Sequence, residues 1–429
     1  MQKSMSKDRI LKDFLSLFSG RVFGAALNFL IMIVLMDRLS ISEFGQFTYF
    51  FALMGGMQLC LDVGMDNSFV AMSAGTYSDD RKLYETGEIT FLNLKYLLGI
   101  LSIVVSISTF AVKQDLLLFA VMLSSIPLGL ADTLLTFLRV KGKFKSVGAL
   151  VAVINVVRLT VVGGLAITKS VSLDSVMYGY VVSNMIYFIV CYFSAGVSKW
   201  KLLLDSDILR RIFSFTKWLF LYNVSIMLMM RMEIFFLKMY SASGQISEND
   251  LGVYGAAFRL AFFLPLVTTS LTAALLPKVA QIKDRAGLDH YLKKIRSMIF
   301  PVAGILAVAF FLSWPLFHYG FAGKYDTSVP VFQLILLGVG SSVFSNTMIL
   351  VFYSTKQFNL LVSLSGVQLI LNAFLDWILI KHYGAMGAGF SMVAVRLIGL
   401  VIVTYFVMNK LEFNREEDKS LLVNKATSV

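Results

Sequence analysis

The sequence predicts an all-α polytopic membrane protein with about 12 transmembrane helices of about 20 residues each. Three observations lead to this fold class: the composition, the length of the apolar runs, and the placement of basic residues. Apolar residues make up 57% of the 429 residues, and charged residues make up only 15%. A soluble domain has about 45–50% apolar residues with glycine included, and about 25% charged residues. The bilayer is therefore the expected solvent for most of this chain.

The apolar runs are long enough to cross about 30 Å of hydrocarbon as helices, at about 1.5 Å per residue. They are continuous rather than alternating in polarity, which favours helices over a transmembrane barrel. The first run is too long for the apolar part of a signal peptide, and no A-x-A site follows it. The expected spans are residues 14–36, 44–64, 89–111, 116–138, 147–168, 175–195, 213–237, 251–276, 298–318, 329–353, 360–380 and 385–408.

Basic residues are distributed unevenly between the loops. An even number of spans places both termini on one side, and the loops of that side hold 26 Lys and Arg residues against 6 in the opposite loops. Cytoplasmic loops carry the excess of basic residues, so we expect both termini in the cytoplasm. The same rule explains the net charge of +12, so we expect no nucleic acid as a partner.

The chain also contains a short internal repeat. Ser42–Phe47 opens the second span and Asn249–Tyr254 opens the eighth, and both read acidic, apolar, Gly, any, aromatic. Six spans per half make the halves parallel in the membrane, and such repeats enclose a substrate path between them. Chance similarity between two interfacial helix starts is the alternative. We expect an N-terminal six-helix bundle at 1–205, a C-terminal six-helix bundle at 206–408 and a cytoplasmic tail at 409–429.

Several spans contain charged residues. One charge at the bilayer centre costs about 2.5–3.5 kcal/mol on the insertion scale, so these residues face a wet cavity, pair with one another or snorkel to the interface. A cavity lined by guanidinium groups attracts anions, and planar Arg suits phosphate oxygens. Structural pairing or snorkelling is the alternative for each residue. The candidate substrate-binding residues are Arg21, Asn28, Arg158, Arg231, Arg259 and Arg396.

Two acidic residues are candidate ion-coupling groups. Glu233 lies near the middle of the seventh span, two residues after Arg231, and this spacing does not bring the two side chains together on a helix. Asp62 ends the second span, where a helix cap or an ion-pair partner is the alternative interpretation. Nothing in the sequence resembles a nucleotide-binding loop, an HExxH helix or a GxSxG elbow. We therefore expect no cofactor, no metal site and no enzymatic activity.

Four motifs in a fixed order are similar to those of a known family. They are E-F-G-Q-F at Glu43–Phe47, L-D-V-G-M at Leu61–Met65, L-G-V-Y-G-A-A-F-R-L at Leu251–Leu260 and Y-G-A-M-G-A-G at Tyr383–Gly389. On these motifs the chain resembles the polysaccharide transporters, the Wzx-type O-antigen flippases. Their superfamily also holds the multidrug-and-toxin extruders and the lipid II flippase. The resemblance covers nearly the whole chain.

The resemblance implies two six-helix bundles arranged as a V around a central cationic cavity, with alternating access coupled to an ion gradient. It implies that the cargo is an undecaprenyl-pyrophosphate-linked oligosaccharide, such as a lipopolysaccharide O-antigen unit, moved to the periplasmic leaflet of the bacterial inner membrane. The implied partners are this substrate, membrane lipids, the polysaccharide polymerase and the chain-length regulator. The related lipid II flippase has cavity arginines in S-x-R and A-x-R-L motifs, which Arg21 and Arg259 match.

Three other function classes stay open at this point. A cation-coupled drug exporter would usually carry an acidic residue in the first span, where this chain has Arg21 and no acid before Asp37. A polysaccharide polymerase or ligase would need a large outer loop, and the longest here runs only from Tyr240 to Asp250. A non-transporting scaffold would not need unpaired arginines in its spans. Lipid II itself is disfavoured as cargo, because its flippase has two further C-terminal spans where this chain has a polar tail.

Overall fold

A computed structural model describes residues 7–62, 65–66, 69–70, 73, 81–113, 115–196, 204–261, 279, 285–354 and 357–409. The described part is almost entirely helical and contains no strand, which confirms the all-α class. Nine helical stretches within it are long and apolar enough to cross a membrane. The helices are α1 (Lys7–Arg38), α2 (Ile41–Asp62), α4 (Arg81–Lys113), α5 (Leu116–Val140), α6 (Phe144–Ile167), α7 (Leu173–Ala195), α8 (Ser206–Ala242), α9 (Asp250–Leu260), α11 (Arg285–Ser297), α12 (Ile299–Gly320), α13 (Ser328–Ser354) and α14 (Phe358–Asn409).

Eleven of the twelve expected spans coincide with these helices over most of their length, and α9 covers the first ten residues of the eighth. Several helices begin a few residues before the apolar run of the span, at a polar residue that caps the helix N-terminus. The Asp205 carboxylate accepts hydrogen bonds from the first backbone amides of α8, and Ser172 and Ser175 form a reciprocal capping box at the start of α7. Residues 262–276 of the eighth expected span and residues 410–429 of the expected tail lie outside the described residues.

Helix α14 contains the last two expected spans. It is interrupted at Gly384, where φ is 53° and ψ is −130°, a backbone conformation that only glycine adopts without strain. The helix that follows this break has an N-cap from elsewhere in the chain, because the Asp250 carboxylate accepts a hydrogen bond from the backbone N–H of Ala385 at 2.9 Å. The Y-G-A-M-G motif therefore separates the eleventh span from the twelfth.

One helix was not expected from hydropathy. Arg285–Ser297, expected only as a basic loop, forms α11. Leu288, Tyr291 and Ile295 recur on one face at helical spacing and are buried. They pack with residues 350–352 of α13 in a small apolar cluster of the C-terminal half. The segment is an amphipathic helix rather than a span, because its other face is basic.

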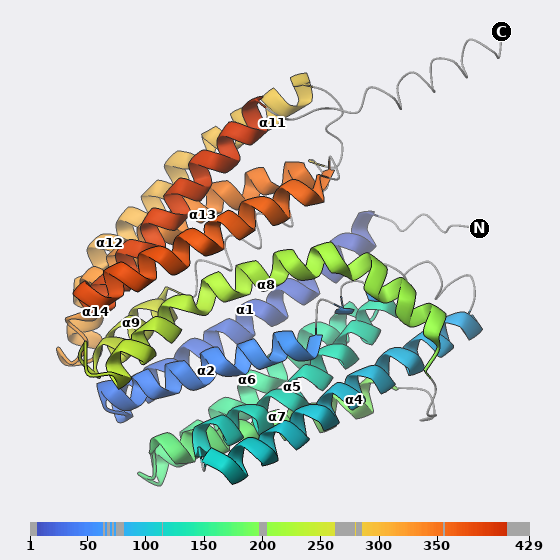
Figure 1. The fold of residues 1–429 in the computed structure, drawn as a ribbon, viewed down its shortest axis with the longest axis horizontal. Helices are drawn as coiled ribbons and strands as arrows, with labels where there is room; N and C mark the ends of the chain where they lie inside the picture. Colours follow the sequence, from blue (N-terminus) through green and yellow to red (C-terminus); the bar gives the residue numbers. More distant parts are fainter. Residues whose placement is uncertain are drawn as a thin grey trace.

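The helices pair in the same way in both halves of the chain. In the N-terminal half α1 packs on α6, α4 on α5, and α5 on α7. In the C-terminal half α8 packs on α14, α12 on α13, and α13 on α14, so the corresponding helices pair in each half. The two groups of helices converge at one end and separate toward the other, which gives the V arrangement of two helical bundles (Figure 1). We call the end where α1 begins and α14 finishes the termini end, and the opposite end the far end.

The two repeated motifs meet at the far end, where α2 crosses α9. A Cβ atom on Gly45 would lie 2.7 Å from the backbone nitrogen of Gly252, and one on Gly252 would clash with the Ile41 carbonyl oxygen. The glycine of each motif is therefore needed for the close approach of these helices. One continuous apolar cluster crosses both halves here, and Phe44 and Tyr254 lie within it. The halves are thus closed against each other at the far end.

Candidate functional site

Three of the five candidate arginines lie together behind this closure. Arg158 lies nine residues before the end of α6, Arg231 eleven residues before the end of α8, and Arg259 nine residues after the start of α9. Each is therefore about 14–17 Å from the far end at about 1.5 Å per residue. The charges of Arg158 and Arg231 both lie close enough to Arg259 to act on it electrostatically. One comes from the N-terminal half and two come from the C-terminal half.

Arg259 is buried against aromatic rings instead of a carboxylate. Its side chain is 8% exposed, and its guanidinium carbon lies 4.1 Å from the ring centre of Phe51 and 6.0 Å from that of Phe47. Among the described residues, neither Nε nor Nη2 of Arg259 has a hydrogen-bond partner. Cation–π contacts stabilise a desolvated guanidinium by about 2 kcal/mol, but they leave its N–H donors unused. The group retains donors for an anion.

Arg158 contacts the same aromatic group from α6. Its guanidinium carbon lies 4.8 Å from the Tyr180 ring centre and 5.8 Å from that of Phe51. One terminal nitrogen donates to the Asn184 side-chain oxygen at 2.7 Å, and Asn184 in turn donates to the Ser124 hydroxyl at 2.7 Å. This network fixes the orientation of the guanidinium, while within the described structure its Nε has no partner. Arg158 is thus positioned by neutral groups that leave its charge uncompensated.

Arg231 reaches from α8 to the backbone of α2. A Cβ atom on Gly55 would lie 2.9 Å from Nη2 of Arg231, so a side chain at position 55 would displace the guanidinium. In the described part of the chain, Nε of Arg231 has no hydrogen-bond partner, and no carboxylate forms an ion pair with Arg158, Arg231 or Arg259. We call these three residues the arginine cluster. Three uncompensated cations in a largely buried position have the charge and the hydrogen-bond donors that a multiply charged anion requires.

The last of the five candidate arginines, Arg396, lies elsewhere, in the interior of the C-terminal bundle. It donates to the Ser342 hydroxyl at 2.6 Å and interacts electrostatically with Glu233. Glu233 and Asp376 are both buried and lie close enough to repel each other, and Asn372 donates to Asp376 at 2.7 Å. One oxygen of Asp376 has no partner among the described residues. This acidic group combines the candidate Glu233 with Asp376 and Asn372, and the sequence signal for the last two is their i, i+4 spacing on one helix face.

The remaining candidates in α1 are not part of the arginine cluster. Helix α1 packs closely on α6 at Gly20 and Gly24, and this leaves Arg21 exposed. Arg21 is seventeen residues from the far end of α1, so it lies about two helical turns closer to the termini end than the cluster. The charge that acts on it is that of Arg139. Asn28 is half-buried and lies at the depth of the cluster.

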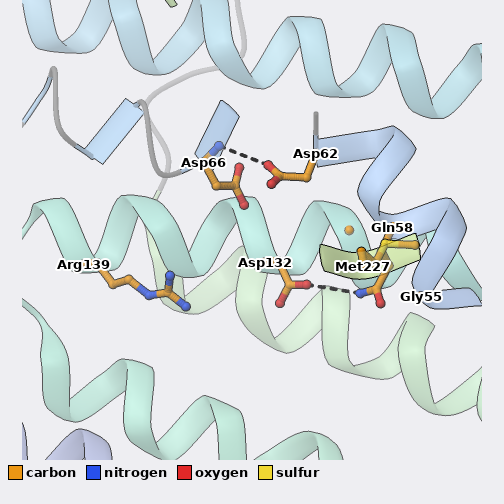
Figure 2. A pocket seen from close by; sticks show the side chains of 8 residues that line it. Gly55, Gln58, Asp62, Asp66, Asp132, Arg139 and Met227 are labelled. Carbon is orange, nitrogen blue, oxygen red and sulfur yellow. Dashed lines mark hydrogen bonds between the residues drawn. The ribbon is translucent and has the colours of Figure 1, made fainter. Parts of the chain in front are cut away.

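A cavity of about 400 Å³ lies closer to the termini end, between α2, α5 and Met227 of α8. Lys95 bridges Asp62 at 2.8 Å and Asp66 at 3.1 Å beside it, and Gln58 donates to Asp132 at 3.2 Å. Figure 2 shows Gln58, Asp62, Asp66, Asp132 and Arg139 around this space. The candidate Asp62 is therefore an ion-pair partner that also lines a cavity. The cavity differs in charge from the arginine cluster, because aspartates predominate in its lining.

Comparisons with known proteins agree with this architecture. A sequence model of the family described as "Polysaccharide biosynthesis protein" matches residues 35–330. The fold is similar to that of the structure titled "Lipid II flippase MurJ, inward closed conformation", with a TM-score of 0.74 and 15% identity over 92% of this chain and 87% of that chain. Among curated proteins, none matches this chain in sequence.

Two transporter structures of the MOP superfamily are also similar. An inward-facing multidrug resistance MATE family transporter gives a TM-score of 0.72 at 13% identity, over 90% of this chain and 94% of that chain. An outward-facing one gives a TM-score of 0.66 at 13% identity, over 92% of this chain and 94% of that chain. These likenesses establish the fold, in which two helical bundles form a V.

Proposed function

We propose that this chain, which belongs to the family of polysaccharide biosynthesis proteins, is a flippase for an undecaprenyl-pyrophosphate-linked oligosaccharide. It moves the lipid-linked sugar from the cytoplasmic to the periplasmic leaflet of a bacterial inner membrane. The oligosaccharide is a surface-polysaccharide repeat unit such as an O-antigen unit. The polymerase and chain-length regulator act on the product.

The arginine cluster is the observation that carries this proposal. A pyrophosphate has several oxygens in tetrahedral arrays, and guanidinium groups bind such oxygens with paired hydrogen bonds. The free donors of Arg158, Arg231 and Arg259 match this chemistry. The sugars would occupy the space between the bundles, while the polyprenyl chain stays in the bilayer. Arg21, which is exposed nearer the termini end, would attract the same anion at the entry.

The conformation supports alternating access. The halves are closed at the far end and separate toward the termini end (Figure 1), and the fold is more similar to the inward-facing transporter than to the outward-facing one. With the termini in the cytoplasm, as the basic loops predict, this is the state that receives cargo from the cytoplasmic leaflet. Opening at the far end would release it.

The acidic group of the C-terminal bundle is the proposed ion-coupling site. Glu233 and Asp376 are buried carboxylates, and Asn372 and Ser391 add further oxygen atoms. Two carboxylates near a single arginine bind a proton or a sodium ion readily, because like charges at close range cannot both remain uncompensated. Binding there would change the electrostatic balance with Arg396.

A second candidate function is export of a cationic drug, which the aspartates of the cavity in Figure 2 favour. A transport assay in vesicles distinguishes the two functions. We expect purified protein in liposomes to flip a fluorescent polyprenyl-pyrophosphate oligosaccharide at a rate that depends on a proton or sodium gradient. Glu233→Gln should flip cargo without that dependence. Accumulation of an organic cation with no movement of the lipid would contradict the flippase proposal.

A further inference from the structure

The connection between α12 and α13 is a compact turn at the far end, comprising residues 321–327. Its backbone takes the left-handed conformation at Ala322 and Gly323, with φ of 49° and 77°. The turn is closed by a hydrogen bond between Nδ1 of His318 and the carboxylate of Asp326 at 2.8 Å, and the amide of Gly323 donates to the His318 carbonyl at 2.9 Å. The turn therefore has a defined shape from its own bonds.

This turn of the C-terminal half contacts the N-terminal half through Lys324. The ammonium donates to the carbonyl oxygens of Met36 at 2.8 Å and Asp37 at 3.2 Å, and also to that of Leu39. These carbonyls belong to the last turn of α1 and the residue that follows it. The final carbonyls of a helix lack partners within the helix and carry the negative end of its dipole, so they are natural acceptors for a cation.

Two further observations extend the contact. Tyr325 is fully buried, and its ring lies 6.1 Å from the ring of Phe44 in an edge-on arrangement. Phe44 precedes Gly45, which meets Gly252 at the crossing of the halves. Burial lowers the pKa of Lys324, whereas the carboxylates of Asp37 and Glu43 act in the opposite direction. An ammonium partly removed from water needs acceptors, and the end of α1 supplies them.

We propose that Lys324 is a gating residue that fastens the two halves of the protein at the far end. Its ammonium and the three carbonyls lie in different halves, so their bonds exist only while the far end is closed. A contact made in one state alone shifts the equilibrium toward that state by its own free energy. Opening toward the far side requires the release of Lys324 from the end of α1. The inference concerns the conformational equilibrium and holds for any cargo, so it is independent of the flippase proposal.

The test measures the separation of the halves without substrate. Spin labels are placed on cysteines introduced at Asp174 and Glu248, which are exposed at the far end of the N-terminal and C-terminal halves respectively. The native Cys60 and Cys191 are replaced by Ser and Ala. Pulsed electron–electron distance measurements then compare the parent protein with Lys324→Met and Lys324→Gln. Lys381→Met is the matched control, because Lys381 is an exposed lysine at the same end.

We expect Lys324→Met to raise the ratio of far-end-open to far-end-closed molecules by about tenfold, since hydrogen bonds to charged groups are lost from one state only. Lys324→Gln, which keeps a polar side chain, should shift it in the same direction, and Lys381→Met should leave the distances unchanged. If the Lys324→Met protein does not accumulate in the membrane, the comparison is made with Lys324→Gln alone. Distance distributions that are the same in the parent and both Lys324 variants would overturn the inference. A shift of equal size in Lys381→Met would overturn it as well.

Discussion

Two buried groups of charges in this protein differ in their partners: carboxylates neutralise the first group, and aromatic rings and neutral polar groups surround the second. Lys95 is 3% exposed and lies 2.8 Å from Asp62 and 3.1 Å from Asp66, so opposite charges of the same half surround it. Arg259 is nearly as buried, yet it lies on the Phe51 ring and makes no ion pair within the described structure. Charge that the chain neutralises itself supports the fold. Charge that the chain leaves open is available for a ligand that arrives from outside.

The energetics of burial make this difference measurable. Removing one partner of a buried ion pair costs about 3–5 kcal/mol, because the other charge remains without compensation. Removing a cation that has no anionic partner relieves a desolvation cost instead. The same kind of substitution should therefore affect stability in the first group and transport in the second.

The largest effect on stability is expected for Lys95→Met. It leaves the carboxylates of Asp62 and Asp66 facing each other without a cation, and we expect a loss of about 3–5 kcal/mol of folding free energy. Thermal unfolding in detergent and the amount of protein in membranes measure this loss. Adding Asp62→Asn and Asp66→Asn should restore part of it. An unchanged melting temperature in Lys95→Met would show that the ion pairs do not support the fold.

The largest effect on transport is expected for Arg259→Leu. Losing a charge-assisted contact to the pyrophosphate should lower the flipping rate by about 100-fold, while the melting temperature stays the same or rises. Arg210→Leu is the control, since Arg210 is an exposed arginine at the termini end. Full transport by the Arg259 variant at normal protein level would remove Arg259 from the substrate site.

A smaller effect is expected for Gly55→Ala. The new Cβ atom would lie 2.9 Å from Nη2 of Arg231 and displace that guanidinium, so flipping should slow severalfold because the anion site loses its geometry. Gly56→Ala is a closely matched control, because a Cβ atom there would lie 3.6 Å from Cε of Met227, an ordinary contact. Equal rates for the two variants would show that the position of Arg231 does not matter.

The smallest effect is expected for Arg21→Ala. Arg21 is exposed and lies about two helical turns from the arginine cluster along the helix axes, so it contributes attraction at the entry rather than a contact to the bound anion. The flipping rate should fall by less than about threefold, and more at low salt than at high salt. A loss as large as that of Arg259→Leu would place the anion nearer to α1 than we propose.

Much of the fold could be predicted from the sequence, since the apolar runs and their polar ends determine where the helices lie. The apolar runs alone place the expected spans within helices in the described part of the chain. The glycine of the Y-G-A-M-G motif separates the last two spans. Helix α11 was missed because its pattern is amphipathic: Leu288, Tyr291 and Ile295 recur among basic residues, which lowers the average hydropathy of the segment below that of a span.

The composition of the site was only partly predictable. The A-x-R-L motif singles out Arg259, but the position of Arg158 and Arg231 beside it depends on how each helix is rotated about its axis. The average hydropathy of a span carries no information about how the helix is rotated about its axis. For the same reason Arg396, similar in sequence setting, was grouped with them although it faces Ser342 in the C-terminal bundle.

The central claim is that the arginine cluster binds a pyrophosphate, and ligand-induced stabilisation tests it most directly. The melting temperature of the purified protein is measured with increasing short-chain polyprenyl pyrophosphate and, in parallel, with the corresponding polyprenol. We predict that the pyrophosphate raises the melting temperature and the alcohol does not. The variant with Arg158, Arg231 and Arg259 all changed to Gln should be folded and show no such rise. Equal stabilisation by the two lipids, or an unchanged response of the triple variant to the pyrophosphate, would contradict the claim.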